Sequence, residues 1–155
     1  MKKVEYLDLL QLIPLGLFFL RLFPLPYRQN AFIVAKSAQL VSVYGTSSES
    51  VFTFMDSAFA QQPTIYNSAT MDLIYNQIVD LIGSGWLAGT GVSENAYTVA
   101  MNSSSPIEME TRYQFKFSAL LSVFATPFFA INGLQIAGLE SLEDWVATLD
   151  ALLNV

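Results

Sequence analysis

Residues 124–137 read FATPFFAINGLQIA, and this stretch decides the fold. Two short apolar segments, Phe128 to Ile131 and Leu134 to Ala137, are separated only by Asn132-Gly133. An Asn-Gly pair between two such segments is the strongest two-residue hairpin signal, because both residues accept the positive φ angles of the turn. The sequence therefore predicts a β-hairpin, with Thr126-Pro127 directly before its first strand.

A helix is predicted after the hairpin, from Ser141 to Leu153. Ser141 is a suitable N-cap, and Asp144 stands three residues later as a capping-box partner. Apolar side chains recur at helical spacing along this segment, namely Leu142, Trp145, Val146, Leu149, Leu152 and Leu153.

Upstream of the hairpin the pattern is helical over about a hundred residues. Gly45 and Pro63 mark two helix ends, and Val51, Phe52, Met55 and Phe59 are expected to form the buried stripe between them. Ala31, Val34, Ala35, Ala38, Val41 and Ser42 form the expected stripe of the preceding helix. The predicted helices are Tyr27–Tyr44, Ser47 or Ser48 to Pro63, Ser68–Ile82, Ser93–Met101 and Pro106–Val123.

The N-terminal stretch Leu9 to Pro26 reads LLQLIPLGLFFLRLFPLP. It is too short and too interrupted for a membrane helix, which needs about 20 apolar residues. Acidic residues precede the apolar run and no cleavage site follows it, so a cytoplasmic location is favoured over secretion. Two apolar runs, Val4 to Leu10 and Leu15 to Phe23, are typical of strands that are covered on both faces of a sheet.

Charge and composition exclude several function classes. The net charge is -6, and no Lys or Arg lies between Ser37 and Thr111, so a nucleic-acid partner is not expected. The chain has no Cys and no His, which excludes thiol redox chemistry and thiolate or imidazole metal sites. No cofactor and no metal are predicted. The carboxylates Glu108, Glu110, Glu140, Glu143 and Asp144 are interpreted as solvated helix ends.

These features together resemble a known family. Thr126-Pro127, the Asn-Gly hairpin and the terminal helix resemble the C-terminal half of the thioredoxin fold, in which this proline is cis. The stretch RLFPLPYRQNAFIVAKSAQ, residues 21–39, and the helical block after it resemble the DsbA-like branch. The resemblance extends from Val4 to Leu153. It implies an α/β fold in which a single thioredoxin-like domain, residues 1–155, carries a helical insertion at residues 28–124.

The chain departs from the family in its first half. The family has a helix with a Cys-x-x-Cys motif between its first two strands, whereas only Gln11 to Pro14 separate them here. The first α-helix is therefore expected to be deleted. Parallel neighbouring strands need a crossover of a dozen or more residues, so these two cannot pair in parallel. They form an antiparallel hairpin, run on as one bent strand, or complete the sheet of another chain.

All three arrangements uncover apolar surface, and Leu15, Leu17 and Phe19 are the predicted interface residues. The expected partner is a protein or peptide, bound in a homodimer or an obligate complex, with no membrane span.

The resemblance also implies a binding site. In the family, backbone groups beside the cis-proline pair with an extended peptide, which makes Ala125, Thr126 and Pro127 the candidate peptide-binding residues. The expected function is that of a redox-inactive thioredoxin-like protein that acts by binding, as a subunit or scaffold. The alternative is a non-thiol enzyme on the same scaffold, such as a glutathione-transferase-like protein or an isomerase. Binding is preferred because Leu9 to Leu15 contain no hydroxyl that could activate a thiol.

Overall fold

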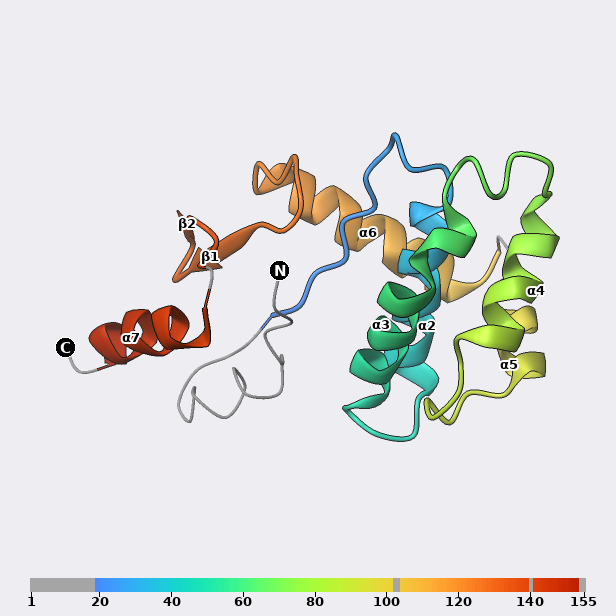
Figure 1. Cartoon of the computed structure of the whole chain (residues 1–155), viewed down its shortest axis with the longest axis horizontal. Helices are drawn as coiled ribbons and strands as arrows, with labels where there is room; N and C mark the ends of the chain where they lie inside the picture. Colours follow the sequence, from blue (N-terminus) through green and yellow to red (C-terminus); the bar gives the residue numbers. More distant parts are fainter. Residues whose placement is uncertain (1–18, 102–103, 140, 154–155) are drawn as a thin grey trace. The chain divides into compact units, whose positions relative to one another are not determined.

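The computed structural model describes residues 19–101, 104–139 and 141–153. The chain divides into two compact units (Figure 1). The first, called the helical unit, is Arg21–Phe124. The second, called the hairpin unit, contains residues from Ala125 onward together with the segment that ends at Leu20.

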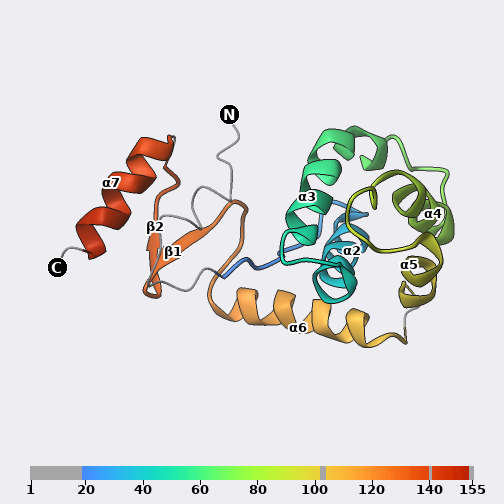
Figure 2. The ribbon, with the colours of Figure 1, turned by 90° about the horizontal axis from the view of Figure 1, so that it is seen from below.

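The helical unit is built around α2, which contacts α3, α5 and α6, while α4 packs against α5 (Figure 2). Its elements are α2 (Ala31–Tyr44), α3 (Ser50–Gln61), the short 3-10 helix η1 (Gln62–Ile65), α4 (Tyr75–Gly85), α5 (Glu94–Ala100) and α6 (Pro106–Leu120).

Helix α2 is buried over most of its circumference. Besides the apolar side chains of Ile33 and Leu40, it buries the polar side chains of Lys36, Ser37 and Gln39. The stripe predicted for this helix is therefore too narrow, and Ser42, its last predicted member, is exposed. A helix with three packed neighbours has no face left for solvent, so periodicity alone could not reveal its orientation.

Helix α3 presents a different face from the predicted one. Phe54 is fully buried against the ring of Trp86, with ring centroids 6.1 Å apart, whereas Phe59 is 58% exposed. The helix also begins later than expected, because the Ser50 hydroxyl accepts the N–H of Ser47 at 3.2 Å and neither Ser47 nor Ser48 caps it.

The predicted starts of α5 and α6 are confirmed. The Ser93 hydroxyl accepts the N–H of Ala96 at 3.3 Å, and Pro106 occupies the first turn of α6. Helix α6 ends at Leu120, before the predicted Val123, because Ser122 adopts a left-handed conformation with φ 63°. The N–H of Val123 then donates to the Ser118 carbonyl at 3.1 Å, which reverses the chain as in a Schellman motif.

The prediction of a second N-terminal strand is wrong over its described part. Residues 19–23 form neither strand nor helix. Instead, the Phe23 ring stacks on Phe115 of α6 at 5.0 Å, and Leu22 packs against the core of the helical unit. These apolar side chains thus pack against helices rather than within a sheet. Residues 1–18, which include the first predicted strand, lie outside the described residues.

The hairpin unit contains the predicted hairpin and terminal helix. Strands β1 (Phe129–Ile131) and β2 (Leu134–Ile136) pair antiparallel, with Ile131 opposite Leu134. Asn132 and Gly133 both have positive φ, 51° and 82°, as a two-residue turn of this type requires. Helix α7 (Leu142–Leu153) follows, and the Ser141 hydroxyl accepts the N–H of Asp144 at 3.1 Å as predicted.

Gly45 is required where α2 turns toward α3. A Cβ at this position would lie 2.6 Å from the Val41 carbonyl oxygen and would also overlap the side chain of Ser50. We expect Gly45→Ala to lower the free energy of unfolding by about 1–3 kcal/mol, as overpacking does. Gly85→Ala is the control, because its nearest neighbour is the flexible end of Gln61 at 3.3 Å. Urea unfolding followed by circular dichroism measures both; an equal midpoint for the two variants would contradict the prediction.

Candidate functional site

The loop before β1 carries the three residues predicted to bind peptide. Ala125, Thr126 and Pro127 are all exposed, and the bond between Thr126 and Pro127 is cis. Within the described residues, the backbone groups of Ala125 and Thr126 make no hydrogen bond. Their N–H and C=O groups are therefore paired with no other part of the chain that the structure describes.

This loop leads directly into a packed element. The Phe129 ring of β1 meets the Trp145 ring of α7 edge-on, with centroids 4.9 Å apart. Trp145 is only 7% exposed, so the contact holds the hairpin against the helix. A site on a loop anchored by a packed strand keeps its geometry better than one on a free loop.

The predicted interface and the segment that bears on the enzyme alternative lie mostly outside the described residues. Of the interface residues, Leu15 and Leu17 are outside, while Phe19 is 69% exposed. The segment Leu9 to Leu15, on which the enzyme alternative depends, is also outside.

A buried ion pair in the helical unit was not predicted. The Lys36 ammonium of α2 lies 2.9 Å from a Glu108 carboxylate oxygen of α6, and the two side chains are 1% and 8% exposed. Lys36 also donates to the Met101 carbonyl at 2.9 Å. Arg112 approaches the other carboxylate oxygen of Glu108 at 2.8 Å.

The interpretation of Glu108 as a solvated helix end is therefore wrong. Its carboxylate is buried because it pairs with Lys36, which lies 72 positions earlier in the sequence. Glu110, Glu143 and Asp144 are exposed as predicted, and Glu140 lies outside the described residues.

The surroundings of this pair fix its charge state. Burial raises the pKa of Glu108, but hydrogen bonds and attraction from Lys36 and Arg112 outweigh it, so the net pKa lies below the usual 4.5. Burial also raises the pKa of Tyr75 and Tyr97. The Tyr97 hydroxyl shares a hydrogen bond of 2.7 Å with Ser37, and the Tyr75 hydroxyl donates to the Met101 carbonyl at 2.8 Å. Each of these groups is engaged by the protein itself, so the cluster is structural.

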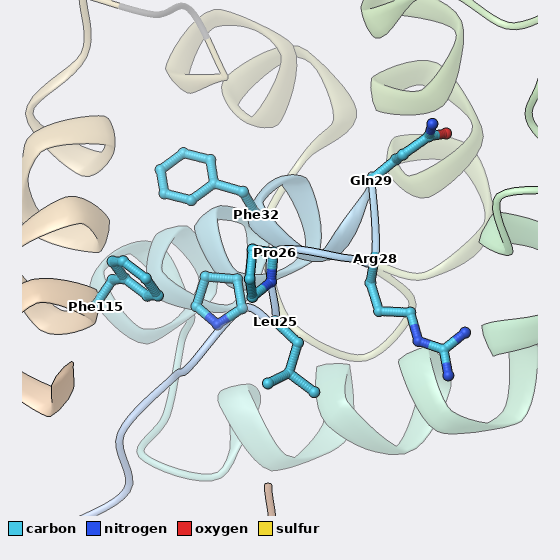
Figure 3. A pocket seen from close by; sticks show the side chains of 7 residues that line it. Leu25, Pro26, Arg28, Gln29, Phe32 and Phe115 are labelled. Carbon is cyan, nitrogen blue, oxygen red and sulfur yellow. The ribbon is translucent and has the colours of Figure 1, made fainter. Parts of the chain in front are cut away.

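A shallow hollow of about 220 Å³ lies where the chain enters α2. In Figure 3 the rings of Phe32, Phe115 and Pro26 gather on one side, whereas the Arg28 guanidinium and the Gln29 amide extend away from them. The lining of the hollow is thus mainly apolar, and neither of these two polar groups is directed at its centre. The complete lining is Pro24, Leu25, Pro26, Arg28, Gln29, Phe32 and Phe115.

Within the described part of the chain, no group of acidic side chains could hold a metal ion. None of the described helices has both the length and the hydrophobicity that a bilayer crossing requires.

Comparison with known proteins identifies the fold. No family model matches this chain, and no curated protein matches it. A crystal structure of a proposed protein-disulfide isomerase from Pseudomonas syringae does match, with a TM-score of 0.68 and 17% identity over 83% of this chain and 72% of that one. The predicted thioredoxin-like, DsbA-like fold is therefore confirmed as a fold. The present chain has no cysteine, so it lacks the thiols that disulfide exchange requires.

The buried ion pair predicts how stability responds to mutation and acid. Glu108→Gln leaves the Lys36 ammonium buried beside a neutral amide, and we expect it to cost about 3–5 kcal/mol of unfolding free energy. Lys36→Met should cost less, because Glu108 keeps Arg112. The exposed Glu110→Gln is the matched control and should stay within about 0.5 kcal/mol of the wild type.

The acid response has a defined sign. Because the pKa of Glu108 is lowered in the folded state, its contribution to stability is fully present above pH 4.5 and is lost as the pH falls through the folded value. Urea unfolding between pH 3 and pH 7 measures this. A Glu108→Gln variant whose stability falls with acid as steeply as that of the wild type would show that another group is responsible.

Proposed function

We propose that this protein binds an extended segment of a polypeptide through the backbone of Ala125 and Thr126 beside Pro127, and that it acts without redox chemistry. The observation that carries the proposal is the exposure of these backbone groups without hydrogen-bond partners among the described residues. An extended peptide offers N–H and C=O groups at regular intervals, so it can pair with such a segment as an added strand does. Recognition would then depend on the main chain of the ligand, with specificity supplied by the neighbouring side chains.

Backbone pairing alone gives weak binding. A hydrogen bond contributes a net stabilisation of about 0.5–1.5 kcal/mol, so a contact over two or three residues does not by itself give a stable complex. The proposed function therefore includes a second contact, a homodimer or obligate complex held through Leu15, Leu17 and Phe19. The high exposure of Phe19 supports this part.

We further propose that residues 28–124 form an insertion in the thioredoxin-like domain. The division of the chain supports it, because the helical unit is continuous in sequence while the hairpin unit draws on residues from both sides of it. On this proposal the insertion is a scaffold, since its buried polar groups are engaged with one another.

Blocking the loop tests the binding site. The probe is a fluorescein-labelled, reduced and carboxymethylated ribonuclease A, which remains unfolded, and binding is measured by fluorescence anisotropy. We expect saturable binding by the wild type and at least about tenfold weaker binding by Ala125→Arg, a loss of about 1.4 kcal/mol. Ala60→Arg, on an exposed position of α3, is the matched control and should bind as the wild type does. Equal affinities of both variants, or no binding by the wild type, would contradict the proposal.

Redox silence is a separate expectation. With no cysteine in the chain, the rates of insulin reduction and of thiol oxidation should equal the uncatalysed background. If insulin reduction or thiol oxidation above background copurified with the folded protein through two chromatographic steps, the protein would catalyse the reaction without a thiol. The proposal that it acts by binding alone would then be wrong.

A further inference from the structure

The turn that closes the hairpin carries chemistry that the proposed function does not use. Asn132 contributes a side-chain amide, and Gly133 contributes a backbone nitrogen with no Cβ beside it. Within the described residues of the hairpin unit, the Asn132 amide makes no hydrogen bond. The amides of Asn30 and Asn67, by contrast, donate to carbonyl oxygens of the helical unit at 2.9 and 3.2 Å. The described structure thus holds those two amides but not the amide of Asn132.

An amide and a backbone nitrogen in this order can react with each other. The Gly133 nitrogen attacks Cγ of Asn132, the new N–Cγ bond closes a succinimide ring, and the Cγ–Nδ2 bond breaks. Ammonia leaves with the proton of the Gly133 N–H. Water then opens the ring at one or the other carbonyl group and leaves an aspartate or an isoaspartate. No oxidant or reductant is needed, and water is the one co-reactant.

The closed turn keeps the reacting atoms apart. Asn132 has a φ of 51°, which lies in the left-handed region, where ψ is about +47°. With this ψ, the Gly133 nitrogen lies on the side of the Cα–C bond of Asn132 that is opposite to Cβ. Ring closure requires that nitrogen on the same side as Cβ, so the peptide plane between the two residues must turn over. That rotation breaks the turn that places Ile131 opposite Leu134.

We propose that Asn132 is a deamidation site and that opening of the hairpin controls its rate. The paired strands protect the amide, and each opening of the hairpin releases the peptide plane. Little holds the hairpin closed within its own unit, because each strand has three residues. The main packing contact there joins the Phe129 ring to the Trp145 ring, with centroids 4.9 Å apart. All of these residues belong to the hairpin unit.

The reaction changes the hairpin permanently. An isoaspartate passes the main chain through its side-chain methylene, so the turn becomes longer than the two-residue turn that sets the strand register. Since the loop with Thr126 and Pro127 leads directly into β1, the altered protein should also bind peptide more weakly. That last consequence rests on the proposed function, whereas the deamidation itself does not.

The experiment is peptide mapping by mass spectrometry of the full chain, incubated at neutral pH in buffer and in urea. We expect conversion at Asn132 in both, at least about tenfold faster in urea, because a reaction of the open form scales with the population of that form. Asn67 is the internal reference. It should stay unconverted in buffer, because its amide is held by the Tyr27 carbonyl.

Two variants test the control by the hairpin. Phe129→Ala removes the ring contact with Trp145 and should speed conversion in buffer by about tenfold, because such aromatic pairs stabilise the packing of their elements. Phe59→Ala, which removes an exposed ring of α3, is the matched control and should convert as the wild type does. Circular dichroism checks that both variants keep their helices.

Several outcomes would overturn the inference. No conversion of the wild type in either medium, or conversion in urea alone, would show that the folded protein is not modified at Asn132. Equal rates in buffer and in urea would show that the hairpin does not protect the amide, even if Phe129→Ala failed to fold. Isoaspartate that persists in Asn132→Gly, which keeps a turn that accepts positive φ, would place the modification elsewhere.

Discussion

The helical unit depends on the ion pair between Lys36 and Glu108. Lys36 lies in the middle of α2, the helix that contacts α3, α5 and α6, and its ammonium is 1% exposed. A buried ammonium is tolerated only when its charge and its donors are satisfied, and here Glu108 and the Met101 carbonyl satisfy them. These two partners lie on α6 and at the end of α5, so one side chain sets the distances among three helices.

The ion pair also fixes the orientation of α6. Because Glu108 faces α2, the side of α6 that carries Tyr113 and Leu120 faces away from α2. A rotation of α6 about its axis would break the pair and leave two unpaired charges in the core, at several kcal/mol each.

The sequence predicts best the features that local chemistry determines. The turn at Asn132-Gly133, the cap at Ser141 and the helix starts at Ser93 and Pro106 involve residues within four positions of one another, and the structure has them where expected. Contacts between distant residues were not predicted. The pairing of Lys36 with Glu108 joins positions 72 apart, and the burial of α2 depends on three helices that periodicity cannot locate. Of the candidate site, the three loop residues were predicted from the resemblance, whereas no local signal indicated the buried ion pair.

The low charge content connects these observations. Only 13% of the residues are charged, against about 25% in a typical soluble domain. Lys36 and Glu108 are buried against each other, so neither contributes to the charged surface. Apolar side chains must then make up more of that surface, as they do along α6 and at Phe19. Exposed aromatic rings beside so few charges favour the proposed association with a partner, because contiguous exposed apolar surface marks interaction sites.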